Sequence, residues 1–188
     1  MAKTFEALDD KLTSFIKAQQ MFFVATAPSG NGGHVNVSPK GLDSFVVLDP
    51  HTVAYLDLGG SGIETVAHVR QNGRITIMFC AFEGAAKILR LYGQGEATTF
   101  DDPGYEELLK LFPGHDRARS VIKVKLDLIQ DSCGWGVPFY EYRGQRDQLT
   151  RYVENRTEEE WKERRYDSNA ESIDGLPGLV RPAQSESA

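Results

Sequence analysis

Three short stretches of this 188-residue chain carry residue types whose spacing suits chemistry on a small molecule. The first is residues 59–62, Gly-Gly-Ser-Gly, which lead into a segment with helical spacing. Glycines let the backbone approach a ligand, and the free amides at a helix start favour an anion such as phosphate. Ser61 and Thr65 add hydroxyl donors. The same residues also fit a plain strand-to-helix turn, closed by a capping box between Ser61 and Glu64.

The second stretch is residues 34–41, His-Val-Asn-Val-Ser-Pro-Lys-Gly. A strand with this ending places a hydroxyl, a proline nitrogen without a proton and a cation close together. Lys40 would then meet a phosphate or the electron-rich edge of a ring. The alternative is an ordinary solvent-exposed lysine in a turn.

The third stretch is residues 131–140, where Trp135 stands between two glycines. This tryptophan would either stack on a flat ring or cover an edge of the core. Cys133 has no histidine near it in the sequence, so we expect no catalytic thiol. The four histidines show no metal-ligand spacing, and no Gly-x-Ser-x-Gly elbow is present. The sequence therefore predicts neither a metal site nor hydrolase machinery.

The elements that position these stretches are mostly β-strands. Apolar residues recur with helical spacing over residues 4–20, which predicts an amphipathic N-terminal helix. Strands are predicted at residues 21–27, 34–38, 45–48, 52–58, 74–82, 87–98 and 121–129. Short helices are predicted after Ser61 and after Asp102. Because most connections are turns, we expect a mainly β fold, an antiparallel barrel and not a doubly wound sheet.

The chain is expected to divide into three parts. Residues 1–20 form a helix packed on the barrel, and residues 21–132 form the barrel core. Residues 133–188 form a C-terminal segment with a charged helix over residues 145–165. Its end, residues 177–188, reads as a frayed polar tail.

The composition excludes several classes of function. A net charge of −6 argues against a general binder of nucleic acid or anionic membranes, because such proteins need a basic face. No apolar run approaches the roughly 18–20 residues that cross a bilayer. Residues 1–6 lack the features of a signal peptide. We therefore expect a cytoplasmic protein in which Cys80 and Cys133 are free thiols.

Taken in order, the motifs of this chain resemble the pyridoxamine 5′-phosphate oxidase-like family of flavin-binding split barrels. The similarity covers about residues 10–178 and is closest to a bacterial and fungal branch that continues with Ser-Cys-Gly-aromatic-Gly-Val-Pro and ends near Ser-x-Asp-Gly-Leu-Pro-Gly. The segments that carry it are residues 22–27, 34–41, 53–65, 72–79, 89–95, 132–138 and 172–178.

The resemblance implies a split barrel that forms a homodimer, with flavin mononucleotide (FMN) in a groove between the subunits. The apolar residues 137–140 support a covered surface of this kind. The implied cofactor-binding residues are Asn36, Val37 and Ser38 along the flavin ring, Lys40 near the ring or phosphate, and Tyr55 and Asp57 beside the ribityl chain. They continue with Ser61, Gly62 and Thr65 at the phosphate, and with Arg90 and Trp135, which close the site from one or the other subunit.

Two departures from the family pattern shape the expected function. Enzymes that oxidise pyridoxamine phosphate hold the FMN phosphate with an Arg-Lys pair, about where Glu64 and Thr65 stand here. The phosphate would then rely on amides, hydroxyls and Lys40, and a deazaflavin is an alternative cofactor. Residues 175–182 also lack the arginine- and histidine-bearing motif that grips the vitamin, so vitamin oxidation is not expected.

The resulting hypothesis is an FMN-dependent oxidoreductase that acts on an unknown small molecule. No catalytic side chain is identified, which is usual when the cofactor carries the chemistry. The alternative is a non-catalytic protein that holds a flavin, a deazaflavin or a haem on the same fold. His34, His51 and His68 are the candidate ligands of a haem.

Overall fold

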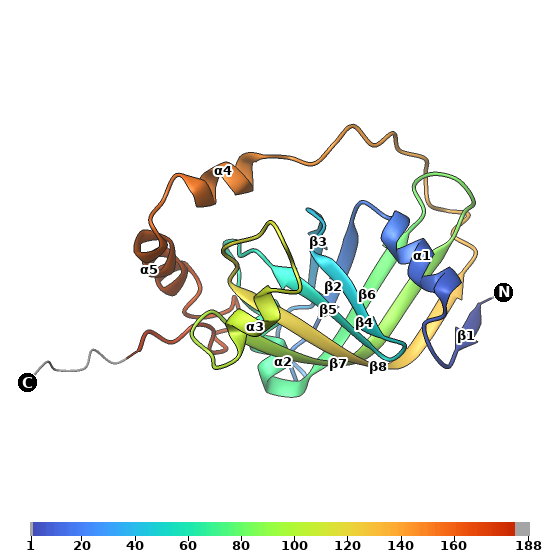
Figure 1. Cartoon of the computed structure of the whole chain (residues 1–188). Coiled ribbons are helices and arrows are strands. Elements are labelled where there is room, and N and C mark those ends of the chain that lie inside the picture. Colours follow the sequence, from blue (N-terminus) through green and yellow to red (C-terminus); the bar gives the residue numbers. More distant parts are fainter. Residues whose placement is uncertain (1, 183–188) are drawn as a thin grey trace, which may run out of the picture.

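A computed structural model describes residues 2–182 and places an eight-stranded sheet at the centre of the molecule (Figure 1). The sheet order is β3-β2-β6-β7-β8-β5-β4, with β1 paired to β8, and every pairing is antiparallel. The strands are β1 (Lys3–Phe5), β2 (Phe22–Thr26), β3 (Asn36–Lys40), β4 (Phe45–Asp49), β5 (Thr52–Asp57), β6 (Arg74–Cys80), β7 (Ile88–Thr99) and β8 (Ser120–Ser132). The helices are α1 (Asp10–Ala18), α2 (Glu64–Asn72), α3 (Tyr105–Leu109), α4 (Gln148–Glu154) and α5 (Glu158–Ser168).

The sheet curls around a hydrophobic core because alternate residues on its strands are apolar and point to the same side. Val24, Ile77 and Leu91 on β2, β6 and β7 are all fully buried in this core. β3 and β4 end the sheet order, yet the Lys40 side chain on β3 contacts Asp57 on β5. The sheet therefore closes on itself as a split barrel, and the predicted fold is confirmed.

The N-terminal helix is shorter than predicted. Asp9 caps α1 by accepting a 2.8 Å hydrogen bond from the Leu12 amide, and the helix buries Leu12 and Ile16 against the barrel. Phe5, expected at the start of this helix, instead lies in β1 opposite Ile129. Helical spacing over residues 4–20 was overridden at its start because the long strand β8 offers β1 a hydrogen-bonding partner.

Strand β3 runs through a proline that was predicted to end it. The strand was expected at residues 34–38, but it spans Asn36–Lys40 and includes Pro39. β3 lies at the edge of the sheet, where a residue without an N–H group is tolerated. This shift carries Lys40 to the end of a regular strand.

The charged helix predicted over residues 145–165 is two helices, α4 and α5. Thr157 starts the second one with a capping box to Glu160. Within α5, Trp161 is 2% exposed and packs edge-on against Phe100, with ring centroids 5.3 Å apart. This contact docks α5 onto the barrel next to β7.

The segment after α5 is packed, contrary to the prediction of a frayed tail from residue 177. The Gly178 amide donates to the Ala170 carbonyl at 2.8 Å, and Leu179 is buried in the main core. Residues 183–188 of the predicted tail lie outside the described part of the chain.

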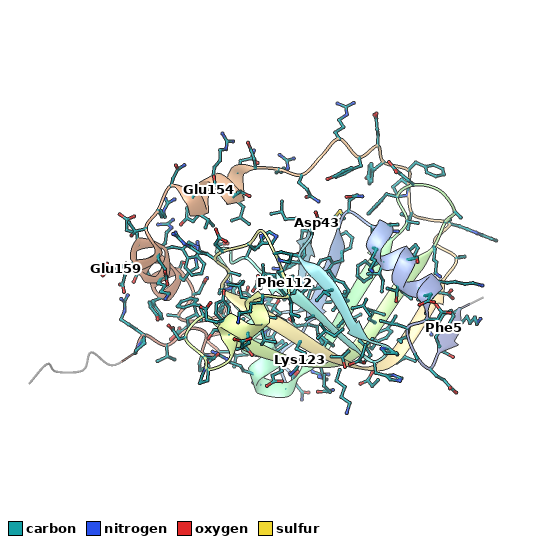
Figure 2. All side chains as sticks on the ribbon, in the orientation of Figure 1. Phe5, Asp43, Phe112, Lys123, Glu154 and Glu159 are labelled. Atoms are coloured by element: carbon teal, nitrogen blue, oxygen red, sulfur yellow. The ribbon has the colours of Figure 1, made fainter. Side chains whose placement is uncertain are left out.

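The chain between β8 and α4 arches over one end of the barrel (Figure 1). In the view of Figure 2, Asp43 lies at this end of the barrel and Glu154 lies on α4, where the arch arrives. We call residues 134–147 the crossing segment. Within residues 2–182, no helix combines the length and the apolar character that crossing a membrane requires.

Candidate functional site

A cavity of about 410 Å³ opens where β3, β5 and the start of α2 meet. Its size falls within the range of small-molecule sites. Six of the residues predicted from the sequence to bind a cofactor line it: Ser38, Lys40, Asp57, Ser61, Gly62 and Thr65. The structure therefore brings together the first two stretches, residues 59–62 and 34–41, which are about 20 positions apart in the chain.

A buried charge cluster forms the floor of this cavity. Asp57 is fully buried, and its carboxylate accepts two hydrogen bonds from Arg119, at 2.6 and 3.2 Å, and one from Lys40 at 2.9 Å. Burial alone would raise the pKa of Asp57, but the charges of Arg119 and Lys40 outweigh it and hold the pKa well below its ordinary value. Asp57 is thus an anion that fixes two cations in place.

Three carbonyl groups of the glycine-rich loop, those of Gly60, Ser61 and Gly62, accept hydrogen bonds from buried side chains. The Arg165 guanidinium donates to the Gly60 carbonyl at 2.9 Å. The Asn169 amide donates to the carbonyls of Gly60 and Ser61 at 3.1 and 3.3 Å. Arg119 donates to the Gly62 carbonyl. Three side chains from distant parts of the chain therefore hold this loop through its oxygen atoms.

The orientation of these carbonyls determines where the loop amides point. A trans peptide has its C=O and N–H groups on opposite sides. The amides of Ser61, Gly62 and Ile63 therefore point away from Arg119, Arg165 and Asn169. These N–H groups are therefore on the side of the loop opposite to the side chains that bind its carbonyls.

The start of α2 has no side-chain cap, and the predicted capping box between Ser61 and Glu64 is wrong. Ile63 occupies the cap position and makes no side-chain cap hydrogen bond. Glu64 instead accepts a 3.2 Å hydrogen bond from the Ile173 amide. The first amides of α2 are therefore left to a ligand or solvent, because a helix start offers several N–H groups without partners inside the helix.

A hydrogen-bond network beside the cavity orients the hydroxyls. The Asn36 amide donates to Thr26 at 3.2 Å and to Thr65 at 3.0 Å, while its oxygen accepts from Ser38 at 3.0 Å. The Thr26 hydroxyl accepts from Asn36, so its own proton is free for His68 Nδ1, 3.0 Å away. His68 is buried and burial lowers its pKa, which favours the neutral ring. In this network the Ser38 oxygen keeps lone pairs and Thr65 keeps a proton.

Five other residues predicted to bind the cofactor do not line this cavity: Asn36, which belongs to the network beside it, and Val37, Tyr55, Arg90 and Trp135. Val37 is 61% exposed, because β3 alternates and only Asn36, Ser38 and Lys40 share its inner face. Tyr55 is fully buried in the core, where burial raises its pKa. The Tyr55 ring packs edge-on against Phe22, with centroids 5.6 Å apart.

Arg90 and Trp135 complete this group. Arg90 donates to the Ser132 hydroxyl at 3.1 Å, on β7 between the buried residues Leu89 and Leu91. Its side chain therefore points to the outer face of the sheet. Trp135 is 86% exposed in the crossing segment.

Arg119, Arg165 and Asn169 were missed by the sequence analysis. All three are at most 5% exposed. A signal for one of them existed: Asp57 ends the buried strand Val-Ala-Tyr-Leu-Asp, and a carboxylate in such a place requires a cation. The identity of that cation depends on the β5–β8 pairing, which no local pattern contains.

The histidines and cysteines do not gather at the site. None of them lines the cavity. His34 is held by Asp174 at 2.6 Å, and His68 is buried in the network described above. Residues 2–182 contain no group of three or more His, Cys, Asp or Glu side chains suited to a metal ion. Cys80 and Cys133 are free thiols.

Comparison with known proteins identifies relatives of the chain. A family model described as Pyridoxamine 5′-phosphate oxidase matches residues 8–133. The chain is 39% identical to the pyridoxamine 5′-phosphate oxidase family protein ustO of Aspergillus flavus, over 93% of this chain and 77% of that protein.

Solved structures show the same fold. A variant of HupZ from Group A Streptococcus superposes with a TM-score of 0.54 and 24% identity, covering 66% of this chain and 98% of that one. A provisionally named pyridoxamine 5′-phosphate oxidase from Lactobacillus delbrueckii superposes with a TM-score of 0.50 and 18% identity, covering 68% and 98%. Arg165 and Asn169 lie beyond the residues that the family model matches.

Proposed function

Because the chain belongs to the pyridoxamine 5′-phosphate oxidase family, we propose that it is a flavin-dependent oxidoreductase that binds FMN and acts on a small molecule. The observation that carries this proposal is the glycine-rich loop, whose carbonyls accept hydrogen bonds from Arg165 and Asn169. Its amides and the uncapped start of α2 then present N–H groups, as a phosphate-binding site requires.

The charges and hydroxyls at the cavity fit a phosphorylated flavin. Lys40, Arg119 and Arg165 bring three positive charges to the loop, against the carboxylates of Asp57 and Glu64. This small positive excess favours a phosphate. Lys40 is the one of these cations with an appreciable exposed surface, at 20% of its side chain, so it is the group placed to contact a ligand.

The hydroxyls and amides would orient the cofactor. Thr65 accepts a hydrogen bond from Asn36, so its own proton is available to a ligand. Ser38 donates its proton to Asn36, so its oxygen lone pairs are available. When bound, FMN would supply the hydride or electron transfer, and the chain would supply position and charge. The cavity lining contains neither histidine nor cysteine, and this favours a flavin over a haem.

The direct test is titration of the purified protein with FMN, followed by flavin absorption and fluorescence, with a deazaflavin in parallel. Lys40→Ala should weaken FMN binding about tenfold or more, since a charge-assisted contact is worth roughly 1.5–3 kcal/mol. Lys123→Ala is the matched control, because Lys123 pairs with Glu96 on the surface of β8. Protein that binds neither cofactor would contradict the proposal. Unchanged affinity in Lys40→Ala would remove this residue from the site.

We also propose that the protein acts as a homodimer. Large apolar side chains are exposed on and just before β3 and on the crossing segment: Val37 (61%), Val35 (72%), Trp135 (86%) and Phe139 (80%). Exposed apolar side chains of this size are commonly covered by a partner. Light scattering at micromolar concentration should therefore give twice the chain mass of 20.9 kDa. A mass of one chain would contradict the dimer.

A further inference from the structure

We infer that a chamber beneath the crossing segment binds the second reactant, a flat, uncharged and largely apolar molecule that carries carbonyl groups. This inference rests on the proposed flavin-dependent function, because it names the class of molecule that would meet the cofactor. The chamber has a volume of about 980 Å³ and lies between the barrel end and residues 140–149.

The chamber adjoins the loop cavity. Residues 39–42 at the end of β3 line both spaces, and so does Leu149 on α4. Lys40 thus lies at their boundary. A molecule in the chamber would therefore stand next to a cofactor whose phosphate is held by residues 59–62.

The crossing segment is attached to the barrel at points around the chamber. The Tyr140 amide donates to the Phe82 carbonyl at 3.0 Å, and the two rings pack with centroids 5.3 Å apart. The Gln145 amide group donates to the Gln20 carbonyl at 3.2 Å. These contacts hold the crossing segment against residues 18–21 and 82–84, which form the opposite wall of the chamber.

The lining of the chamber suits an apolar, flat molecule with hydrogen-bonding groups. Aromatic and aliphatic side chains supply contact surface, and four glutamines supply amide donors and acceptors without charge. The large apolar lining residues are Met21, Leu42, Phe82, Tyr140, Tyr142 and Leu149, and the glutamines are Gln19, Gln20, Gln145 and Gln148. The amide and tyrosine donors match carbonyl oxygens on the ligand.

Charges of both signs line the chamber, and most of them are engaged by other protein groups, which argues for an uncharged ligand. Lys40 is bound by Asp57, and Arg143 lies 3.6 Å from Glu141. Glu83 accepts a hydrogen bond from the Tyr142 amide. Arg146 is the remaining cation of the lining.

Duroquinone is a suitable probe, because it is flat and uncharged, carries two carbonyl groups, and its methyl groups block addition of thiols. Its dissociation constant should be measured by calorimetry on the FMN-loaded and the flavin-free protein. Tyr140→Ala and Gln145→Ala should each raise this constant, and the double variant should raise it about tenfold or more. Glu154→Ala, at the exposed far end of α4, is the control and should leave it unchanged (Figure 2).

The outcomes separate this inference from the proposed function. FMN binding should be unchanged in Tyr140→Ala and Gln145→Ala, because neither residue lines the loop cavity. If FMN binds but duroquinone does not, or binds equally to all variants, the chamber inference is overturned and the flavin proposal stands. If duroquinone binds in a Tyr140-dependent way while FMN does not bind, the chamber is supported as a binding site and the proposed function is overturned.

Discussion

Asp57→Asn should lower the free energy of unfolding by about 3–5 kcal/mol, the usual cost of removing one partner from a buried ion pair. The variant keeps the size of the side chain but leaves Arg119, at 4% side-chain exposure, without its counter-charge. For a chain of this size the melting temperature should fall by roughly 6–20 °C. Thermal and urea unfolding would measure both quantities.

Two further measurements sharpen this test. Asp127→Asn, on the exposed face of β8, should leave the stability nearly unchanged. The double variant Asp57→Asn with Arg119→Met should cost less than the sum of the two single variants, because the unpaired charge is then removed as well. A loss below about 1 kcal/mol in Asp57→Asn would contradict the role of this ion pair.

Acid should remove the same contribution. The folded-state pKa of Asp57 lies below its unfolded value, so the unfolded chain takes up the proton first. The stabilisation is therefore fully present above the unfolded pKa, near 3.9, and is lost as the pH falls further. Asp57→Asn should show a smaller loss of stability than the wild type over this range.

Gly178→Ala should destabilise the fold by about 1–3 kcal/mol and also weaken FMN binding. A Cβ atom at this position would overlap the Asn169 carbonyl oxygen and lie 2.8 Å from an Ile63 methyl group. Because Asn169 holds the carbonyls of Gly60 and Ser61, its displacement would loosen the loop that presents amides to the phosphate. FMN titration should show an affinity loss of about tenfold, or about 1.4 kcal/mol.

Gly136→Ala is the matched control for this substitution. No atom lies within 4 Å of a Cβ placed on Gly136, so the added methyl group is accommodated. Both variants change one hydrogen to a methyl group outside the barrel strands. Equal stability and equal FMN affinity in the two would show that the close contact at Gly178 does not position the loop.

The barrel was predictable because its long strands show clear alternation. β7 and β8 were expected close to their observed bounds, since Leu89, Leu91, Val124 and Leu126 mark the buried face. The first strand was not predicted. Three residues at Lys3–Phe5 carry too short a pattern to compete with the helical spacing that follows.

About half of the candidate site was predictable, namely the half that lies within local motifs. Ser38, Lys40 and Ser61 stand in stretches whose residue types point to an anion. Arg165 and Asn169 were not predictable, because they reach the loop only through the docking of α5, more than 100 positions later in the chain. Glu64 was misread because its partner, the Ile173 amide, belongs to the same distant segment.

That long separation sets an order of events during synthesis. Residues 59–62 leave the ribosome first, and the side chains that hold their carbonyls, Arg165 and Asn169, are made more than 100 residues later. A nascent or truncated chain that stops before α5 has the barrel strands, but it lacks the side chains that hold the carbonyls of residues 59–62. Such a chain lacks Arg165 and Asn169, so under the proposed function we expect it to bind FMN more weakly than a chain that includes α5.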